Sequence, residues 1–144
     1  MEALQFKFKA MALPGHTHGH IAYYSQDHNL IFSGDVLFGL GCGRLFEGTA
    51  EEAYKSLALI KKLPRNTLVY CTHEYTETNL NFCESVLHAD SDEFKKYKKE
   101  LLDKRKNNQP SVPLLLESEL RCNPFLSAVS ADEFAAIRSL RNQF

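Results

Sequence analysis

The most informative segment of this 144-residue sequence is Leu13-Pro14-Gly15-His16-Thr17-His18-Gly19-His20. It places three histidines within five positions, and imidazole is the commonest protein ligand for zinc-like metals. The two glycines permit sharp turns that would expose the side chains between them. Taken alone, the segment fits a metal site or a surface turn with solvated histidines equally well.

Two later segments carry further candidate ligands. Phe32-Ser33-Gly34-Asp35 places an aspartate directly after a β-prone stretch, and Tyr70-Cys71-Thr72-His73-Glu74-Tyr75 places a histidine after another. By itself Asp35 could form a turn or cap a helix, and His73 could be an ordinary packed residue. The three segments gain weight only through their order along the chain.

The pattern of apolar residues predicts strands before residue 75 and helices after it. Alternating apolar residues predict a strand over residues 4–10, residues 21–25 and 30–33 form a hairpin, and residues 67–71 form a buried strand. A helix begins at Thr49, where Glu52 completes a capping box, and buries the stripe Ala53, Leu57 and Ile60. The helices expected in the second half cover residues 77–87, 92–106, 115–120 and a last one from Ser130.

Composition narrows the class of protein. Hydrophobic residues make up 44% and the net charge is −1, which gives no electrostatic case for nucleic acid or anionic membranes as partners. No apolar run could span a bilayer, and the N-terminus does not resemble a signal peptide. We therefore expect a cytoplasmic protein whose four cysteines (Cys42, Cys71, Cys83, Cys122) are reduced.

The order GHTxGH, SGD and THEY resembles the metallo-β-lactamase superfamily. Residues 41–50, 72–76, 122–125 and 137–144 are similar to one branch of it, glyoxalase II, also called hydroxyacylglutathione hydrolase. The resemblance implies an α+β fold: residues 1–75 would form the second half of an αββα metallo-β-lactamase sandwich. Residues 76–144 would form an all-helical, substrate-binding region.

The resemblance also implies an activity. Members of that family use two metal ions to activate water, which hydrolyses a glutathione thioester, commonly S-D-lactoylglutathione, to glutathione and D-lactate. By similarity, His16 would bind one metal, His73 the other, and the catalytic Asp35 would bridge them. His20 would support the ligands without binding metal, and His18 has no role. Zinc, iron and manganese all suit this set of ligands.

Five residues match family positions that bind the glutathione tripeptide: Arg44, Phe46, Tyr75, Arg138 and Arg141. Guanidinium groups pair well with the carboxylates of glutathione. Many relatives carry Tyr where this chain has Phe46, so one hydrogen bond of about 1 kcal/mol would be lost.

The family's principal metal motif, THxHxDH, does not occur in this sequence. Each metal would therefore have one histidine plus the shared Asp35, fewer than the three protein ligands usual for catalytic zinc. The sheet would also lack its usual cover over residues such as Phe6, Phe8 and Ile31. This predicts association, either of the chain with itself or with a partner that supplies the N-terminal half. A truncated gene, a fragment or an internal start is the simplest account.

Three functions remain open from the sequence. The first is a glutathione thioester hydrolase that needs the other half of the fold. The second is a non-catalytic remnant, or module, that still binds glutathione. The third is a single-metal enzyme in which His16, Asp35 and His73 surround one ion.

Overall fold

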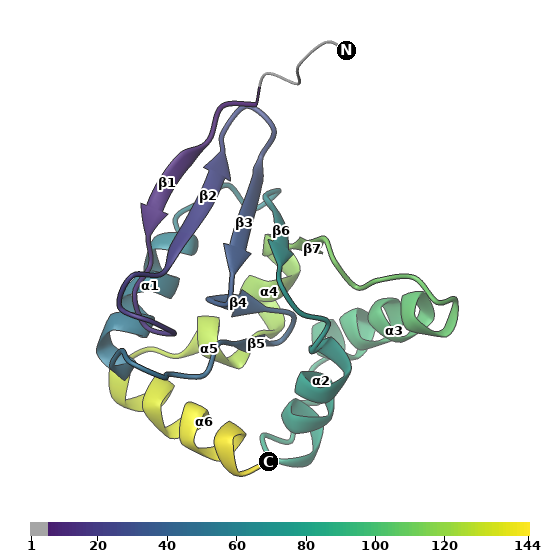
Figure 1. The fold of residues 1–144 in the computed structure, drawn as a ribbon. Coiled ribbons are helices and arrows are strands. Elements are labelled where there is room, and N and C mark those ends of the chain that lie inside the picture. The colour runs from purple at the N-terminus through teal and green to yellow at the C-terminus, as the bar shows by residue number, and fades with distance from the viewer. Residues whose placement is uncertain (1–5) are drawn as a thin grey trace.

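A computed structural model describes residues 6–144 (Figure 1). Its strands are β1 (Lys9–Ala12), β2 (Ile21–Ser25), β3 (Leu30–Gly34), β4 (Leu37–Phe38), β5 (Gly41–Cys42), β6 (Leu68–Cys71) and β7 (Leu114–Leu115). Its helices are α1 (Ala50–Ile60), α2 (Thr76–Ser85), α3 (Asp92–Lys106), α4 (Leu116–Cys122), α5 (Pro124–Ser127) and α6 (Ala131–Gln143). No helix within residues 6–144 is long and apolar enough to cross a membrane.

The main sheet has five strands in the order β1-β2-β3-β6-β7. The β2–β3 hairpin predicted from the sequence is present, and β1 and β7 pair antiparallel at the two edges. Strands β3 and β6 run parallel, and α1 forms the connection between them. Because parallel strands end at the same edge of a sheet, this pairing brings Asp35 and His73 together.

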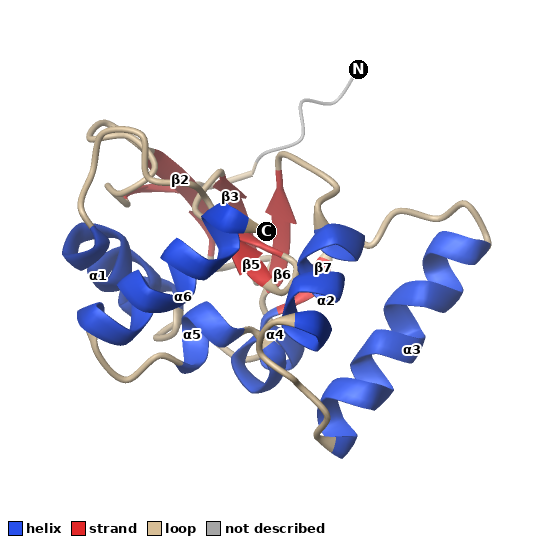
Figure 2. Cartoon of the chain, turned by 90° about the horizontal axis from the view of Figure 1, so that it is seen from below, coloured by secondary structure: helices blue, strands red, loops and turns tan. Residues whose placement is uncertain are grey.

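Helix α1 covers one face of the sheet. The predicted capping box is formed: the Glu52 amide donates to the Thr49 hydroxyl, and the Glu52 carboxylate accepts from the Thr49 amide. The stripe Ala53, Leu57 and Ile60 is buried in one core with sheet residues. Seen from below, the strands lie along one side of the molecule and the helices lie on the other (Figure 2).

No helix of the described residues covers the opposite face of the sheet. Its large apolar side chains are 36–46% exposed, a high value for residues of a central sheet. They are Phe8, Ile21, Tyr23, Phe32, Leu68 and Leu115. We call this group the bare sheet face.

Three expectations about the strands are corrected by the structure. Ile31 was expected on the uncovered face, but it is fully buried under α1, and its neighbour Phe32 is exposed instead. The first strand is Lys9–Ala12 and not residues 4–10, because its pairing with β2 runs from Lys9 opposite Tyr24 to Ala12 opposite Ile21. Residues 4 and 5 of that expected strand lie outside the described residues. Strand β6 is not fully buried, since Leu68 belongs to the bare sheet face.

The second half is helical, as predicted, and α4 and α6 begin close to the expected residues. The buried side of α3 consists of Phe94, Tyr97 and Leu101, as its pattern indicates. The sequence did not predict the small β4–β5 hairpin, the last strand β7 or the short helix α5. Packing crosses the predicted boundary at residue 75: Leu40 of the β4–β5 turn lies in the core of α2 and α3, whereas Phe134 of α6 joins the core under the sheet.

Candidate functional site

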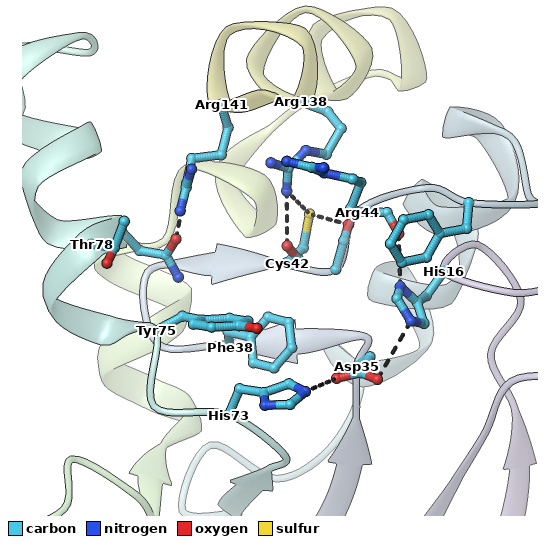
Figure 3. Close-up of a pocket in the computed structure, with 13 residues that line it drawn as sticks. His16, Asp35, Phe38, Cys42, Arg44, His73, Tyr75, Thr78, Arg138 and Arg141 are labelled. Carbon is cyan, nitrogen blue, oxygen red and sulfur yellow. Dashed lines mark hydrogen bonds and ion pairs between the residues drawn. The ribbon is translucent and has the colours of Figure 1, made fainter. Parts of the chain in front are cut away.

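All eight candidate site residues line a single cavity of about 610 Å³. The cavity lies between the carboxyl ends of β3 and β6, the β4–β5 hairpin and the helices α2 and α6 (Figure 3). The predicted metal ligands lie on its strand side and the arginines on its helix side. The eight are His16, Asp35, Arg44, Phe46, His73, Tyr75, Arg138 and Arg141.

Asp35 lies between the two candidate histidines. Its Oδ2 is 3.4 Å from Nε2 of His16, and its Oδ1 is 3.5 Å from Nε2 of His73. The two histidines thus face different oxygens of one carboxylate. Within residues 6–144, no three side chains of His, Cys, Asp or Glu converge closely enough to hold one ion by themselves. This geometry suits a carboxylate that two ions share better than a single ion held by all three residues.

The hydrogen bond behind His16 shows which of its nitrogens is available. Nδ1 of His16 is 2.7 Å from the carbonyl oxygen of Arg44, and a carbonyl can only accept, so Nδ1 carries a proton. In a neutral imidazole Nε2 is then a bare acceptor that faces the Asp35 carboxylate. Two acceptors at 3.4 Å repel each other unless a cation, either a proton or a metal ion, lies between them. The donor set therefore fits a metal ion on this side of Asp35.

Asp35 is held by neighbours on both sides. The Thr72 hydroxyl donates to Oδ1, and the backbone amide of Asp35 donates to Nε2 of His20 at 3.0 Å. Burial lowers the pKa of His20, and nearby His16 lowers it further, so the imidazole stays neutral and can accept this bond. Gly34 permits the contact: its φ is +57°, and a Cβ there would lie 2.6 Å from Nε2 of His20. His20 thus orients Asp35 from behind, and exposed His18 points to Glu52, away from the cavity.

Aromatic rings form the wall next to His73. The imidazole stacks on Tyr75, with ring centroids 4.9 Å apart, and Phe38 packs against both rings. On the opposite side, Phe46 packs edge-on against His16 at 5.0 Å and is 68% exposed. Both candidate metal-binding histidines therefore have a fixed ring orientation on the cavity side.

Three arginines form a cationic cluster on the helix side. Arg138 is only 6% exposed, and its Nη1 donates to the Cys42 carbonyl at 2.8 Å, while its Nε has no partner. Arg141 donates to Asn79 at 3.1 Å. Burial lowers the pKa of Arg141, and the neighbouring guanidinium groups of Arg138 and Arg44 lower it further. Among residues 6–144 no carboxylate forms an ion pair with any of the three. Arg138 is buried and Arg141 is half-buried, whereas Arg44 is exposed. Burying the Arg138 cation without an anion costs stability, which favours an anionic ligand there.

Cys42 lies at the base of this cluster. Burial raises the pKa of its thiol to about 11, so the group stays protonated at neutral pH despite the nearby arginines. All four cysteines are free in the structure. Cys42 therefore lines the cavity with a neutral side chain, and its backbone carbonyl accepts the hydrogen bond from Arg138.

Sequence reasoning missed five lining residues: Phe38, Cys42, Gly43, Thr78 and Asn79. Two of them come from the β4–β5 hairpin, which has no strand pattern in the sequence. The two glycines of this hairpin are the feature of the sequence that could have indicated it, because they allow it to pack closely against α2. A Cβ at Gly39 would lie 2.5 Å from Thr76, and one at Gly41 would lie 2.3 Å from Asn79.

Comparisons with known families match almost the whole chain. The pattern described as "Metallo-beta-lactamase superfamily" matches residues 2–73, and the pattern described as "Hydroxyacylglutathione hydrolase C-terminus" matches residues 74–144. A protein named hydroxyacylglutathione hydrolase from Bdellovibrio bacteriovorus is 54% identical over 94% of this chain and 57% of its own length. One of the same name from Pelagibacter ubique is 42% identical over 96% of this chain and 58% of its own length. The chain thus spans about half the length of the curated relatives it matches.

Solved structures show the same fold. ETHE1 from Myxococcus xanthus superposes with a TM-score of 0.63 at 27% identity, covering 96% of this chain and 48% of that one. A metallo-β-lactamase from Staphylococcus aureus gives a TM-score of 0.61 at 18% identity, covering 98% of this chain and 40% of that one, which supports the fold alone. In both cases the chain corresponds to less than half of a complete protein.

Proposed function

The chain belongs to the hydroxyacylglutathione hydrolase family of the metallo-β-lactamase superfamily, and from this premise we propose that it forms the glutathione-binding and part of the metal-binding machinery of a glutathione thioester hydrolase. The resemblance found in the sequence and the α+β fold are thereby confirmed. The proposed substrate is S-D-lactoylglutathione. Water adds to the acyl carbon, the carbon–sulfur bond breaks, and the products are D-lactate and glutathione, whose sulfur takes the proton.

The observation that carries this proposal is the arrangement around Asp35. Nε2 of His16 faces one carboxylate oxygen, because Nδ1 is bonded to the Arg44 carbonyl, and Nε2 of His73 faces the other. The matching family description, metallo-β-lactamase superfamily, names a metal, and these donor groups are ones that bind metal ions. We propose zinc as the metal, with iron and manganese as ions that the same ligands accept. A bound metal would act as a Lewis acid and make water reactive at neutral pH.

The remaining residues of the cavity bind and orient the substrate. Arg138 and Arg141 hold the carboxylates of the tripeptide, because they are the unpaired cations that lie deepest in the site. Arg44 adds a third positive charge, and Tyr75 and Phe46, which line the same cavity, flank the peptide. Binding at these groups would hold the thioester carbonyl beside Asp35 while the acyl group projects outward.

The bare sheet face supports a requirement for a second half of the fold. Six large apolar side chains are each more than one-third exposed across adjacent strands. A contiguous apolar patch of this kind marks an interaction surface. We propose that the N-terminal half of the sandwich covers it, supplies the ligands that complete both metal positions, and makes the site active. Without that half, self-association through the same face is expected.

A second candidate function is glutathione binding without turnover. The observation in its favour is the asymmetry of the site: the arginine side is fully assembled, but each metal position has one histidine and a shared carboxylate from residues 6–144. The single-ion enzyme is the weakest candidate, since the three ligands do not converge on one point.

Calorimetric titrations of the isolated chain test the proposal. Zinc affinity should fall in His16→Ala, which leaves only the position on the His73 side, and should be unchanged in His18→Ala, which removes a histidine from the same segment but outside the cavity. Glutathione should bind to all three proteins. If His16→Ala binds zinc as tightly as wild type, the assignment of the metal position is wrong. If none of the three binds glutathione, the assignment of the arginine cluster is wrong.

A further inference from the structure

A buried carboxylate outside the cavity holds the hairpin that forms the cavity wall. Glu119 of α4 is fully buried, and its Oε2 accepts from the backbone amide of Leu40 at 2.9 Å. The same oxygen accepts from Nδ2 of Asn123 at 2.8 Å, and Oε1 accepts from the Tyr97 hydroxyl at 2.6 Å. No cation pairs with Glu119 among the described residues, so three neutral donors satisfy it.

Asn123 extends this network to the rest of the hairpin. Its Nδ2 also lies 3.2 Å from the carbonyl of Phe38 and 3.1 Å from that of Gly41. Its Oδ1 accepts from the amide of Phe125 and so caps α5. The segment Cys-Asn-Pro-Phe at residues 122–125 thus has a physical role: one side chain joins a helix start to both strands of the β4–β5 hairpin.

The hairpin needs this support because its backbone is strained. Leu40 has φ +55°, a left-handed conformation that is unfavourable for a residue with a branched side chain. Its side chain is fully buried. Such a conformation persists only where the surroundings impose it, and here the bond from the Leu40 amide to Glu119 does so.

The residues on either side of this turn form opposite walls of the cavity. Phe38 packs against Tyr75 at 5.2 Å and His73 at 6.0 Å. Cys42 accepts from Arg138 at 2.8 Å. A shift of the turn would therefore move the aromatic wall and the buried arginine together (Figure 3).

We propose that Glu119 is a positioning residue for the glutathione pocket: by accepting from the Leu40 amide it fixes the 38–41 turn and thereby sets the affinity for the tripeptide without touching it. That glutathione is the ligand rests on the proposed function, whereas the role of Glu119 in fixing the 38–41 turn does not. Glu119 does not line the cavity, and its hydrogen bonds within residues 6–144 join it to Leu40 of the turn, Tyr97 and Asn123.

Three variants separate this role from general stability. Glu119→Leu removes the acceptor of the Leu40 amide. In Glu119→Gln the side-chain oxygen can still accept from the Leu40 amide and from Asn123. The new amide NH₂ group then faces Tyr97, whose hydroxyl oxygen can accept a hydrogen bond from it. Tyr97→Phe removes a donor to Glu119 but leaves the bond to the turn intact, so it serves as the matched control for lost stability.

The measurements are hydrogen exchange at the backbone amides of residues 39–44, glutathione affinity and thermal midpoint, all on the full chain. In Glu119→Leu we expect exchange at the turn to rise and glutathione affinity to fall by about tenfold or more each, the effect of losing one hydrogen bond to a charged group. In Glu119→Gln both should stay within about threefold of wild type. Tyr97→Phe should lower the midpoint and leave both other readouts unchanged.

Specific results would overturn the proposal. If Tyr97→Phe weakens glutathione binding as much as Glu119→Leu, the effect is loss of stability and not positioning. If exchange at the turn rises in Glu119→Leu but affinity holds, the turn does not set affinity. Should Glu119→Leu fail to fold, Glu119→Asp gives a milder form of the same test, since its carboxylate is one methylene shorter and cannot reach the Leu40 amide from the same backbone position. A wild-type chain that binds no glutathione would overturn the proposed function, and exchange at the turn would still decide whether Glu119 fixes it.

Discussion

Replacing Arg138 by methionine should stabilise the chain while it weakens glutathione binding. Arg138 is 6% exposed, it has no carboxylate partner among residues 6–144, and its Nε is unpaired. Replacing a buried charge by an apolar side chain of similar length is worth about 1–4 kcal/mol. Loss of the bond to the Cys42 carbonyl costs about 1 kcal/mol. The stacking of Arg138 over Phe125, 5.2 Å away, is replaced by a sulfur–aromatic contact of similar strength.

The net gain in the free energy of unfolding should therefore be about 0–3 kcal/mol, and each 1 kcal/mol raises the midpoint by roughly 4 °C for a chain of this size. Glutathione would lose a charged hydrogen-bonding partner worth about 1.5–3 kcal/mol, a weakening of about 10- to 150-fold. Urea unfolding and calorimetric titration with glutathione measure the two effects on the same protein. Opposite signs for stability and affinity are typical of a group kept for binding.

The matched control is Arg121→Met. Arg121 is an exposed arginine of α4 that pairs with Glu117 one helical turn away, so stability should change by less than about 0.5 kcal/mol and glutathione affinity not at all. The reasoning is refuted if Arg138→Met is less stable than wild type, because Arg138 would then be a structural residue. Unchanged glutathione affinity in that variant would refute it as well.

Further predictions concern pH, the backbone and the sheet. Burial raises the pKa of Glu119 above 4.5, so the folded chain keeps this proton to higher pH than the unfolded chain does. Relative to Glu119→Gln, wild type should therefore lose stability as pH rises from 4.5 through the raised pKa, and urea unfolding that shows the opposite slope contradicts this. Gly34→Ala should cost about 2–4 kcal/mol through its positive φ and the clash with His20, whereas Gly19→Ala, with open space around it, should cost far less. Phe32→Lys should reduce self-association in sedimentation experiments, and an unchanged distribution of species would exclude the bare sheet face as the interface.

Local chemistry made much of the fold predictable. The start of α1 is specified by Thr49 and Glu52, which cap each other, and the start of α6 by Ser130, whose hydroxyl accepts from the Glu133 amide. The β2–β3 hairpin follows from two β-prone stretches around a polar turn. The site residues could be named because each follows a strand end or lies in a motif whose order is specific.

Features that depend on long-range packing could not be predicted. Alternation along β3 shows that Ile31 and Phe32 face opposite sides, but only the position of α1 decides which side is covered. The β4–β5 hairpin has two residues per strand, too few for a periodic pattern, and it is held by Glu119 from 79 residues away. In the sequence, Glu119 is an ordinary charged residue of a short helix, and its burial appears only in the folded chain.

We propose that this chain contributes half of a thioester hydrolase whose other half supplies the remaining metal ligands. The most direct test measures hydrolysis of S-D-lactoylglutathione by this chain mixed with the N-terminal part of the Bdellovibrio bacteriovorus relative, the part that the chain does not span. With zinc present, the mixture should hydrolyse the thioester, neither half alone should match it, and His16→Ala should abolish the activity. A mixture that associates and binds glutathione and zinc but shows no turnover, or equal turnover with His16→Ala, would contradict the claim.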